Sequence, residues 1–240
     1  MIRVRDIHKS FGSNAVLQGV DLDVATGQSR VVIGASGSGK SVLLKTILGL
    51  IPRDRGEITV DGQPEFDMAR VGMLFQGSAL FDSLPVWQNV AFRLLRQMPR
   101  PEARAIALDK LARVGLDADV ADRLPAELSG GMQKRAALAR AIAGDPEILF
   151  FDEPTTGLDP IMAGRINRLI RDIVREMNVT ALTITHDMTT VRTVADVVSL
   201  VHEGRVRWQG DVAELDTAAD SYLRAFVRGA DPNAPSGEDL

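Results

Sequence analysis

Residues 34 to 41, GASGSGKS, have the spacing of a phosphate-binding loop, with a glycine, four residues, then glycine, lysine and serine. They lie between two apolar runs, RVVI and VLLKTILGL, which are typical of a strand and a helix. Backbone N–H groups of such a loop converge on phosphate oxygens, and the helix N-terminus adds partial positive charge. Lys40 could reach the β- and γ-phosphates of a nucleotide, and Ser41 could ligate Mg²⁺. The predicted phosphate-binding residues are Gly34, Ser36, Gly37, Ser38, Gly39, Lys40 and Ser41. A glycine-rich turn with a solvated lysine is the alternative, which the flanking elements disfavour.

Two adjacent carboxylates, Asp152 and Glu153, follow the apolar run ILFF. A carboxylate at the end of a buried strand beside a phosphate-binding loop can hold Mg²⁺, usually through water, and we assign Asp152 to this role. Glu153 then points to the place of an attacking water, which it could orient and deprotonate as the γ-phosphoryl group leaves. Taken alone, DEP after a strand is more often a solvated turn.

Three further residues could complete a nucleotide site. His186 closes the apolar run TALTIT and could donate a hydrogen bond to the γ-phosphate if its strand is parallel to the others, because ligands of open α/β sheets bind at the carboxyl edge. Gln76 closes VGMLF and could contact Mg²⁺ or the water and release it again. Phe11 offers a flat face to an adenine. The structural alternatives are a surface histidine, a turn glutamine and a core phenylalanine.

The stretch ELSGGMQKR, residues 127 to 135, places two glycines at the start of a predicted helix. Ser129 is a candidate N-cap, and Gly130 and Gly131 leave backbone N–H groups uncovered, as a bound anion requires. Taken alone, the stretch could be only a sharp turn into a helix. Because residues 34 to 41 already account for one phosphate, we predict that this second anion site faces the γ-phosphate held by a second copy of the chain.

The elements that must position these residues have an α/β pattern. Later strand-like runs such as ILFF are continuously apolar, which indicates a parallel sheet buried on both faces. Helical periodicity replaces strand signals between residues 86 and 145, where WQNVAFRLLRQM, a helix opened by Pro101 and the helix after Ser129 are predicted. Further helices are expected near residues 161 to 177 and 188 to 195.

The composition is that of an ordinary globular protein, with 45% hydrophobic and 25% charged residues among 240. A net charge of -4 gives no reason to expect a nucleic-acid partner, and the absence of cysteine excludes disulfides and cysteine-ligated metals. No apolar run is long enough to span a membrane, and the start lacks a secretory core, so a cytoplasmic location is predicted. The acidic tail, residues 229 to 240, is predicted to be disordered.

The motifs GASGSGKS, Gln76, LSGGMQ, ILFFDEP, TGLD and His186, in this order, resemble those of the ATP-binding subunits of ABC transporters over residues 1 to about 228. The resemblance implies one ATPase domain with a P-loop NTPase core, in which a mostly parallel sheet is joined by an antiparallel β subdomain. Residues 1 to 85 and 146 to 228 would form that core, and residues 86 to 145 an inserted all-helical subdomain. ATP and Mg²⁺ would be the cofactors.

The same resemblance implies individual roles. Lys40, Glu153 and His186 would act in hydrolysis, and Phe11 would stack on adenine. Ser41, Gln76 and Asp152 would serve the metal, and Gln76 would also couple the site to the permease. Asp159, at the end of the D-loop formed by residues 157 to 159, would be among the nucleotide-binding residues. The signature of the family has glutamine where this chain has Met132, with Gln133 one residue later. Partners would be a second copy of the chain, a membrane permease and, in some systems, a small cytoplasmic accessory subunit and a periplasmic substrate-binding protein.

A narrower likeness lies in MLFQGSALFDSLPVWQNVAFRLL and in SGGMQKRAALARAIAGDPEILFFDEPTTGLDPIMAG. These stretches are similar to the ATPases of Mce-type phospholipid transporters, which maintain outer-membrane lipid asymmetry and are linked to toluene tolerance. The implied function is energising phospholipid transport between the inner and outer membranes, from the cytoplasmic face of the inner membrane. An importer of amino acids or other small solutes, and an ABC ATPase outside transport, are the alternatives.

Two apolar groups have both a core and an interface interpretation. Four aromatic residues lie within 18 positions: Phe75, Phe81, Trp87 and Phe92. Packing in the core would account for most of them, and the resemblance implies that some line a groove for a helix of the permease. The segment SYLRAFVR places Tyr222, Leu223, Phe226 and Val227 on one helical face, which would dock on the core of the chain or contact a partner.

Overall fold

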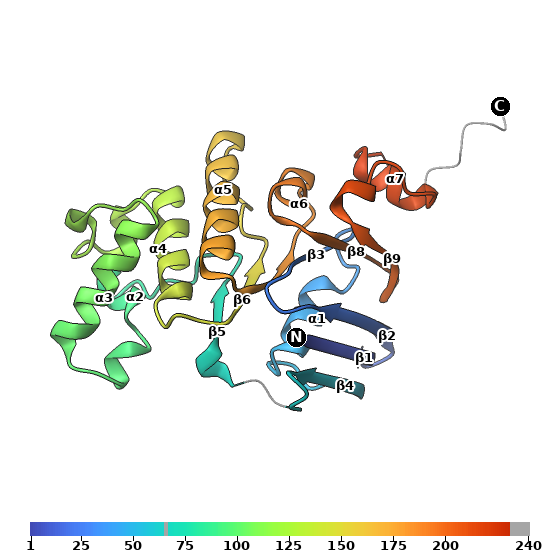
Figure 1. Cartoon of the computed structure of the whole chain (residues 1–240), viewed down its shortest axis with the longest axis horizontal. Helices are drawn as coiled ribbons and strands as arrows, with labels where there is room; N and C mark the ends of the chain where they lie inside the picture. Colours follow the sequence, from blue (N-terminus) through green and yellow to red (C-terminus); the bar gives the residue numbers. More distant parts are fainter. Residues whose placement is uncertain (65–66, 231–240) are drawn as a thin grey trace.

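A computed structural model describes residues 1–64 and 67–230 of the chain (Figure 1). At its centre is a six-stranded sheet of order β5-β6-β7-β3-β8-β9, parallel except for β9, which is antiparallel to β8. Disorder was predicted for residues 229–240; Gly229 and Ala230 have defined positions, and the remainder of that stretch lies outside the described residues. The strands in this order are β5 (Val71–Leu74), β6 (Ile148–Asp152), β7 (Thr180–Ile184), β3 (Ser29–Ile33), β8 (Val197–His202) and β9 (Arg205–Asp211).

The inner strands are continuously apolar because both faces of the sheet are covered. Successive side chains point to opposite faces of the sheet and so join two different clusters. Val31 and Ile33 pack with the later helices, which follow β5 in the sequence, whereas Val32 packs on the other face with α1 (Lys40–Ile47). Phe150 and Phe151 divide in the same way. The alternation fixes the register, since a one-residue slip would exchange the two faces.

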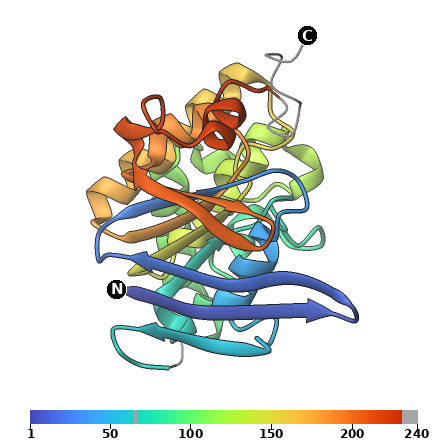
Figure 2. The ribbon, with the colours of Figure 1, turned by 90° about the vertical axis from the view of Figure 1, so that its right-hand side faces the viewer.

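A second, antiparallel sheet of order β2-β1-β4 closes the α1 side of the molecule. Its strands are β1 (Ile2–Phe11), β2 (Asn14–Val24) and β4 (Arg55–Val60). They alternate buried and exposed residues because only one face packs on the core. Figure 2 shows this sheet in blue and teal on one side of the molecule, with the red α7 (Ser221–Val227) on the other.

Residues 86–145 contain helices and no strand, as their periodicity predicts. The helices are α2 (Val86–Val90), α3 (Arg100–Arg113) and α4 (Gly130–Ile142), with short 3-10 turns at Leu94–Arg96, Ala118–Val120 and Pro125–Glu127. One continuous helix over WQNVAFRLLRQM was expected, but α2 ends at Val90. The Arg93 guanidinium turns back to donate to the carbonyl oxygens of Met68 and Val71, which draws this segment toward β5.

Two further helices cover the face of the central sheet on which Val31 and Ile33 lie. They are α5 (Pro160–Met177) and α6 (Met188–Val194), with 3-10 turns at Met68–Arg70 and Val212–Glu214 elsewhere. The buried stripe of α5 repeats at helical spacing through Ala163, Ile166, Ile170 and Ile173. Tyr222 and Leu223 of α7 are buried in the same core, so this helix docks on its own chain. No helix of residues 1–64 and 67–230 has the length and hydropathy to span a membrane.

Candidate nucleotide site

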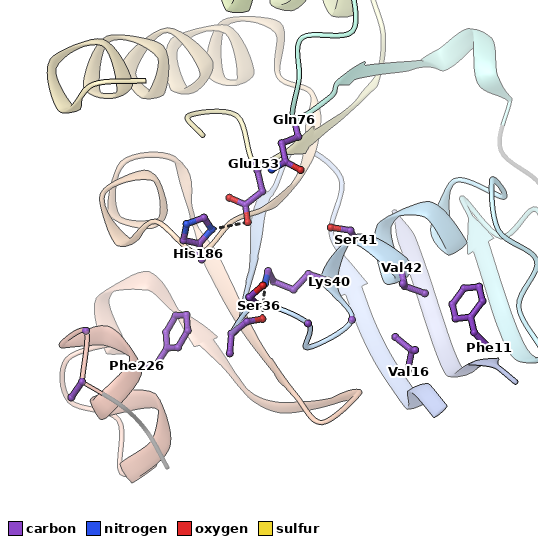
Figure 3. A pocket seen from close by; sticks show the side chains of 15 residues that line it. Phe11, Val16, Ser36, Lys40, Ser41, Val42, Gln76, Glu153, His186 and Phe226 are labelled. Carbon is purple, nitrogen blue, oxygen red and sulfur yellow. Dashed lines mark hydrogen bonds and ion pairs between the residues drawn. The ribbon is translucent and has the colours of Figure 1, made fainter. Parts of the chain in front are cut away.

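The predicted site residues meet at the carboxyl edge of the parallel strands. β3 runs into the glycine loop, β6 into Glu153, β7 into His186 and β5 into Gln76, and these strands are neighbours in the order β5-β6-β7-β3. The edge opens into a cavity of about 840 Å³ (Figure 3). Of the predicted residues, the cavity is lined by Phe11, Ser36, Gly37, Gly39, Lys40, Ser41, Gln76, Glu153 and His186.

The glycine loop requires glycine at two positions for different reasons. A Cβ on Gly34 would lie 2.3 Å from the Val201 carbonyl oxygen and 2.6 Å from Ser38 Oγ. Gly39 caps α1 with φ of 100°, a left-handed conformation that side chains disfavour. Gly34 and Ser38 therefore shape the loop from behind and do not line the cavity.

Lys40 folds back over the loop that precedes it. Its ammonium donates to the carbonyl oxygens of Gly34 at 2.8 Å and Ala35 at 3.0 Å, and the residue is 7% exposed. Burial lowers the pKa of Lys40, while Glu153 and then Asp152 act in the opposite direction. The cation is thus placed at the centre of the loop, where the phosphates of a nucleotide would lie.

Glu153 is held by residues that follow β7. Its Oε1 lies 2.9 Å from His186 Nδ1, and Thr185 Oγ1 donates to its Oε2 at 3.2 Å (Figure 3). The Glu153 side chain is 11% exposed and that of His186 is 63% exposed, so the histidine is open to the cavity. The backbone at Glu153 has φ of 47°, a strained conformation for a residue with a side chain. Such strain gathers at functional sites, because it persists only where the surroundings enforce it.

Asp152 lies behind this pair and fits a metal ligand. Its Oδ1 is buried and has no hydrogen-bond partner among the described residues. Burial raises the pKa of Asp152, and the neighbouring Glu153 carboxylate raises it further. Together with Ser41 and Gln76 it forms an all-oxygen donor set, which suits Mg²⁺. The described residues contain no group of three acidic or histidine side chains that could hold a metal ion by themselves.

Phe11 lies at the opposite end of the cavity from His186, beside Val16 and Val42 (Figure 3). Its ring is 49% exposed, and the Lys9 ammonium lies 5.4 Å from the ring centre. This half of the cavity is apolar, as an adenine requires, while the half around Lys40 is polar. The core interpretation of Phe11 is therefore wrong.

Besides Gly34, Ser38 and Asp152, which lie next to lining residues, four predicted residues do not line this cavity: Ser129, Gly130, Gly131 and Asp159. Ser129 is the N-cap of α4, and its Oγ accepts from the Met132 N–H at 3.3 Å. Asp159 is the N-cap of α5, accepting from the N–H groups of Ile161 and Met162 at 3.0 Å each. Both helix starts belong to a part of the surface outside the chain's own nucleotide cavity.

The structure accounts for the unusual order of Met132 and Gln133. The Met132 side chain is half-buried against the core of the helical region. Gln133 donates from Nε2 to the carbonyl oxygens of Pro125 at 2.9 Å and Leu128 at 3.4 Å. Gln133 therefore secures the turn that leads into Ser129, although it stands one residue after the glutamine position of the family signature.

Two contributions to the site were missed from the sequence. The C-terminal helix brings Phe226 to the cavity wall that faces the glycine loop (Figure 3), and Gly229 and Ala230, just after the helix, also line the cavity. Lys134 of α4 is 4% exposed and lies close enough to Asp152 and Glu153 for their charges to act against the lowering of its pKa by burial. The one sequence signal for Lys134 was that a lysine interrupts the alanine-rich, buried side of α4.

The fold and the site define a P-loop protein that hydrolyses a nucleoside triphosphate, with a helical region beside the core. Residues 17–156 match the family model described as ABC transporter. The chain belongs to the ABC transporter family. It is an ATP-binding subunit, an ATPase that uses ATP and Mg²⁺.

Curated relatives match nearly the whole of this chain and between 69% and 90% of their own length. The phospholipid transport ATP-binding protein MlaF of Haemophilus influenzae is 38% identical, covering 95% of this chain and 90% of that protein. The probable ribonucleotide transport ATP-binding protein mkl of Mycobacterium leprae is also 38% identical, covering 95% and 69%. The methionine import ATP-binding protein MetN of Caulobacter vibrioides is 41% identical, covering 96% and 73%.

A solved structure has the same architecture. The ATP-binding cassette MJ0796, as a dimer bound to ADP and Pi after hydrolysis, superposes with a TM-score of 0.79 at 29% identity, covering 88% of this chain and 99% of that one. The predicted fold class, a P-loop core of mostly parallel strands with an antiparallel sheet and helices, is confirmed.

Proposed function

We propose that this ATPase energises a membrane permease that moves phospholipid between the inner and outer membranes, from the cytoplasmic face of the inner membrane. Support for the substrate comes from the 38% identity with MlaF over 95% of the chain. The observation that carries the ATPase part is the meeting of Lys40, Glu153 and His186 at one 840 Å³ cavity. Import of methionine or another small solute is the second candidate, on the likeness to MetN.

In the proposed mechanism the residues of the cavity divide the work. Phe11 stacks on the adenine, and the loop N–H groups with Lys40 hold the β- and γ-phosphates. Glu153 orients the attacking water and accepts its proton, while His186 holds Glu153 and reaches toward the γ-phosphate. Ser41, Gln76 and Asp152 would hold Mg²⁺, which supplies charge stabilisation for the transferred phosphoryl group.

The site as proposed is complete only in a pair of chains. Support comes from the capped N-terminus of α4, where Gly130 is exposed beside Ser129 and away from the chain's own cavity. These N–H groups would bind the γ-phosphate held by the partner, with Asp159 near the same interface. Closure of the pair would drive the permease, and hydrolysis would reset it. A cytoplasmic accessory subunit and a periplasmic substrate-binding protein are further partners in this proposal.

The permease contact is proposed to involve the exposed aromatics after β5. Phe75 is 39% exposed and Phe81 is 43% exposed, whereas Trp87 is 7% exposed and belongs to the core of the helical region. Trp87→Ala should therefore lower stability, since truncating a buried tryptophan typically costs about 3–5 kcal/mol. Phe81, an exposed aromatic, is the residue to test for coupling between ATP hydrolysis and the permease.

The experiment is reconstitution of the chain with its permease in vesicles that contain fluorescent phospholipid. ATP-dependent transfer of the lipid to acceptor vesicles is expected with wild-type protein and is absent with Glu153→Gln. In parallel, the same complex is tested for ATP-dependent uptake of labelled methionine and ribonucleotides. Uptake of either solute, without lipid transfer, would replace the phospholipid proposal with the solute importer.

A further inference from the structure

The loop from Gln76 to Ala79 is bound to α4 by two cations of that helix. The Lys134 ammonium donates to the backbone carbonyl oxygen of Gln76. The Arg140 guanidinium donates to the carbonyl oxygens of Ser78 and Ala79, both at 2.7 Å. The Gln76 side chain lines the nucleotide cavity. The main chain of the loop is thus hydrogen-bonded to α4, while the side chain of Gln76 lies in the nucleotide cavity.

Burying the charged ammonium of Lys134 costs free energy unless hydrogen bonds or an opposite charge compensate it. Lys134 is 4% exposed, and among the described residues no carboxylate lies within ion-pair distance of its ammonium. The buried residues of α4 around it are mostly alanine, leucine and isoleucine, and the charges of Asp152 and Glu153 offset only part of the burial that lowers the pKa of Lys134. Lys110 of α3 is the contrast, because it is equally buried but pairs with Asp145 at 2.6 Å.

The loop itself is tightly wound and is also secured at its far end. Ser78 and Ala79 both have left-handed backbones, with φ of 61° and 50°, and the Ala79 N–H donates to the Gly77 carbonyl at 2.6 Å. Further along, Asn89 of α2 is fully buried, accepts from the Phe81 N–H at 2.7 Å and donates to the Phe81 carbonyl at 3.1 Å. Helical elements therefore hold both ends of the loop.

We propose that Lys134 is a positioning residue for Gln76, which makes the loop and α4 move as one body. The helix whose N-terminus begins at Ser129 then also sets where the Gln76 side chain lies in the cavity. A movement of α4 toward the γ-phosphate of a partner would carry Gln76 with it, so two parts of the site would be set by one helix. The inference rests on the proposed role of Gln76 in hydrolysis.

Lys134→Met tests this, with Lys110→Met as the matched control from the same helical region. Two quantities are measured on the full chain: kcat and KM for ATP, and hydrogen–deuterium exchange of the backbone amides of residues 77–80. For Lys134→Met we expect kcat to fall about tenfold with KM within about twofold, because the phosphate loop is untouched. Exchange at Ser78 and Ala79 should rise about tenfold, as local opening becomes easier. Lys110→Met should change neither loop exchange nor kcat.

The outcomes separate the possible roles of Lys134. Unchanged exchange with reduced kcat would mean that Lys134 acts through its charge on Asp152 and Glu153, and would overturn the positioning role. A raised KM with wild-type kcat would assign it to nucleotide binding, with the same consequence. If Lys134→Met does not fold, Lys134→Gln keeps an amide donor at shorter reach and should give intermediate exchange. Absence of ATPase activity in the wild type would refute the proposed function, while the exchange measurement still decides the positioning role.

Discussion

At the scale of residues, Glu153 and Asp152 are adjacent carboxylates with different environments. Glu153 is held by Thr185 and His186, whereas Asp152 Oδ1 is buried without a partner among the described residues. The first arrangement fixes a carboxylate in orientation, as a general base requires. The second leaves an oxygen available to a cation. The chain thus separates two roles that the dipeptide alone does not distinguish.

Glu153→Gln should bind ATP as the wild type does and hydrolyse it about 10²- to 10⁴-fold more slowly, the usual contribution of a general base. Steady-state phosphate release and binding of a fluorescent ATP analogue measure the two properties. Glu176→Gln is the control, because Glu176 is an exposed carboxylate that pairs with Arg113 far from the cavity. Wild-type turnover in Glu153→Gln would reject the assignment.

Asp152→Asn should abolish Mg²⁺-dependent hydrolysis and raise the stability of the protein without ligand by about 1 kcal/mol, because a buried charge is removed. Since the pKa of Asp152 lies above its ordinary value of 3.8, its contribution to stability falls as pH rises from about that value through the folded pKa. The gain in Tm of Asp152→Asn should therefore be larger at pH 7 than at pH 4. Thermal unfolding at both pH values measures it, and an equal or smaller gain at pH 7 would contradict the argument.

At the scale of elements, the site depends on how closely β3, its loop and β8 approach. Gly34 follows β3 directly, and the carbonyl of Val201 in β8 occupies the space that a side chain would need. The loop therefore keeps its shape by backbone packing against a neighbouring strand. This contact is remote in sequence from the loop.

Gly34→Ala should lower the free energy of unfolding by about 1–3 kcal/mol, since a Cβ would overlap the Val201 carbonyl at 2.3 Å. It should also weaken nucleotide binding. Gly164→Ala in α5 is the control, because its Cβ would meet nothing within 4 Å, and alanine should stabilise the helix by about 0.5–1 kcal/mol. Denaturant titration gives both values, and equal effects of the two substitutions would contradict the packing argument.

At the scale of the molecule, the fold class and most of the nucleotide cavity were predictable from the sequence. Strand ends followed by Gly34, Gln76, Glu153 and His186 share one edge because parallel neighbours must end together. The contacts of Lys134 and the place of Phe226 were not predictable. A backbone carbonyl that accepts a hydrogen bond leaves no trace in residue type, and Lys134 finds its acceptor 58 residues upstream. The contacts of Arg93 were not predictable for the same reason, because its guanidinium donates to the backbone carbonyl oxygens of Met68 and Val71.

The proposed pairing of two chains gives a test at this scale. Lys40→Ala and Ser129→Arg should each be inactive alone, but their mixture should recover about a quarter of the wild-type rate if copies associate at random. A mixed pair joins the intact glycine loop of one chain to the intact Ser129 of the other. ATPase assays of the separate and mixed variants measure this, and a mixture without activity would count against a shared site.

The left-handed backbone at Glu153 affects how a protein of this fold could change by mutation. A residue with a side chain in that conformation costs about 1 kcal/mol relative to glycine, and this chain carries the cost at the position proposed to activate water. A descendant that retained the fold for another purpose could replace Glu153 with glycine and become more robust, so loss of catalysis would come with a gain in stability.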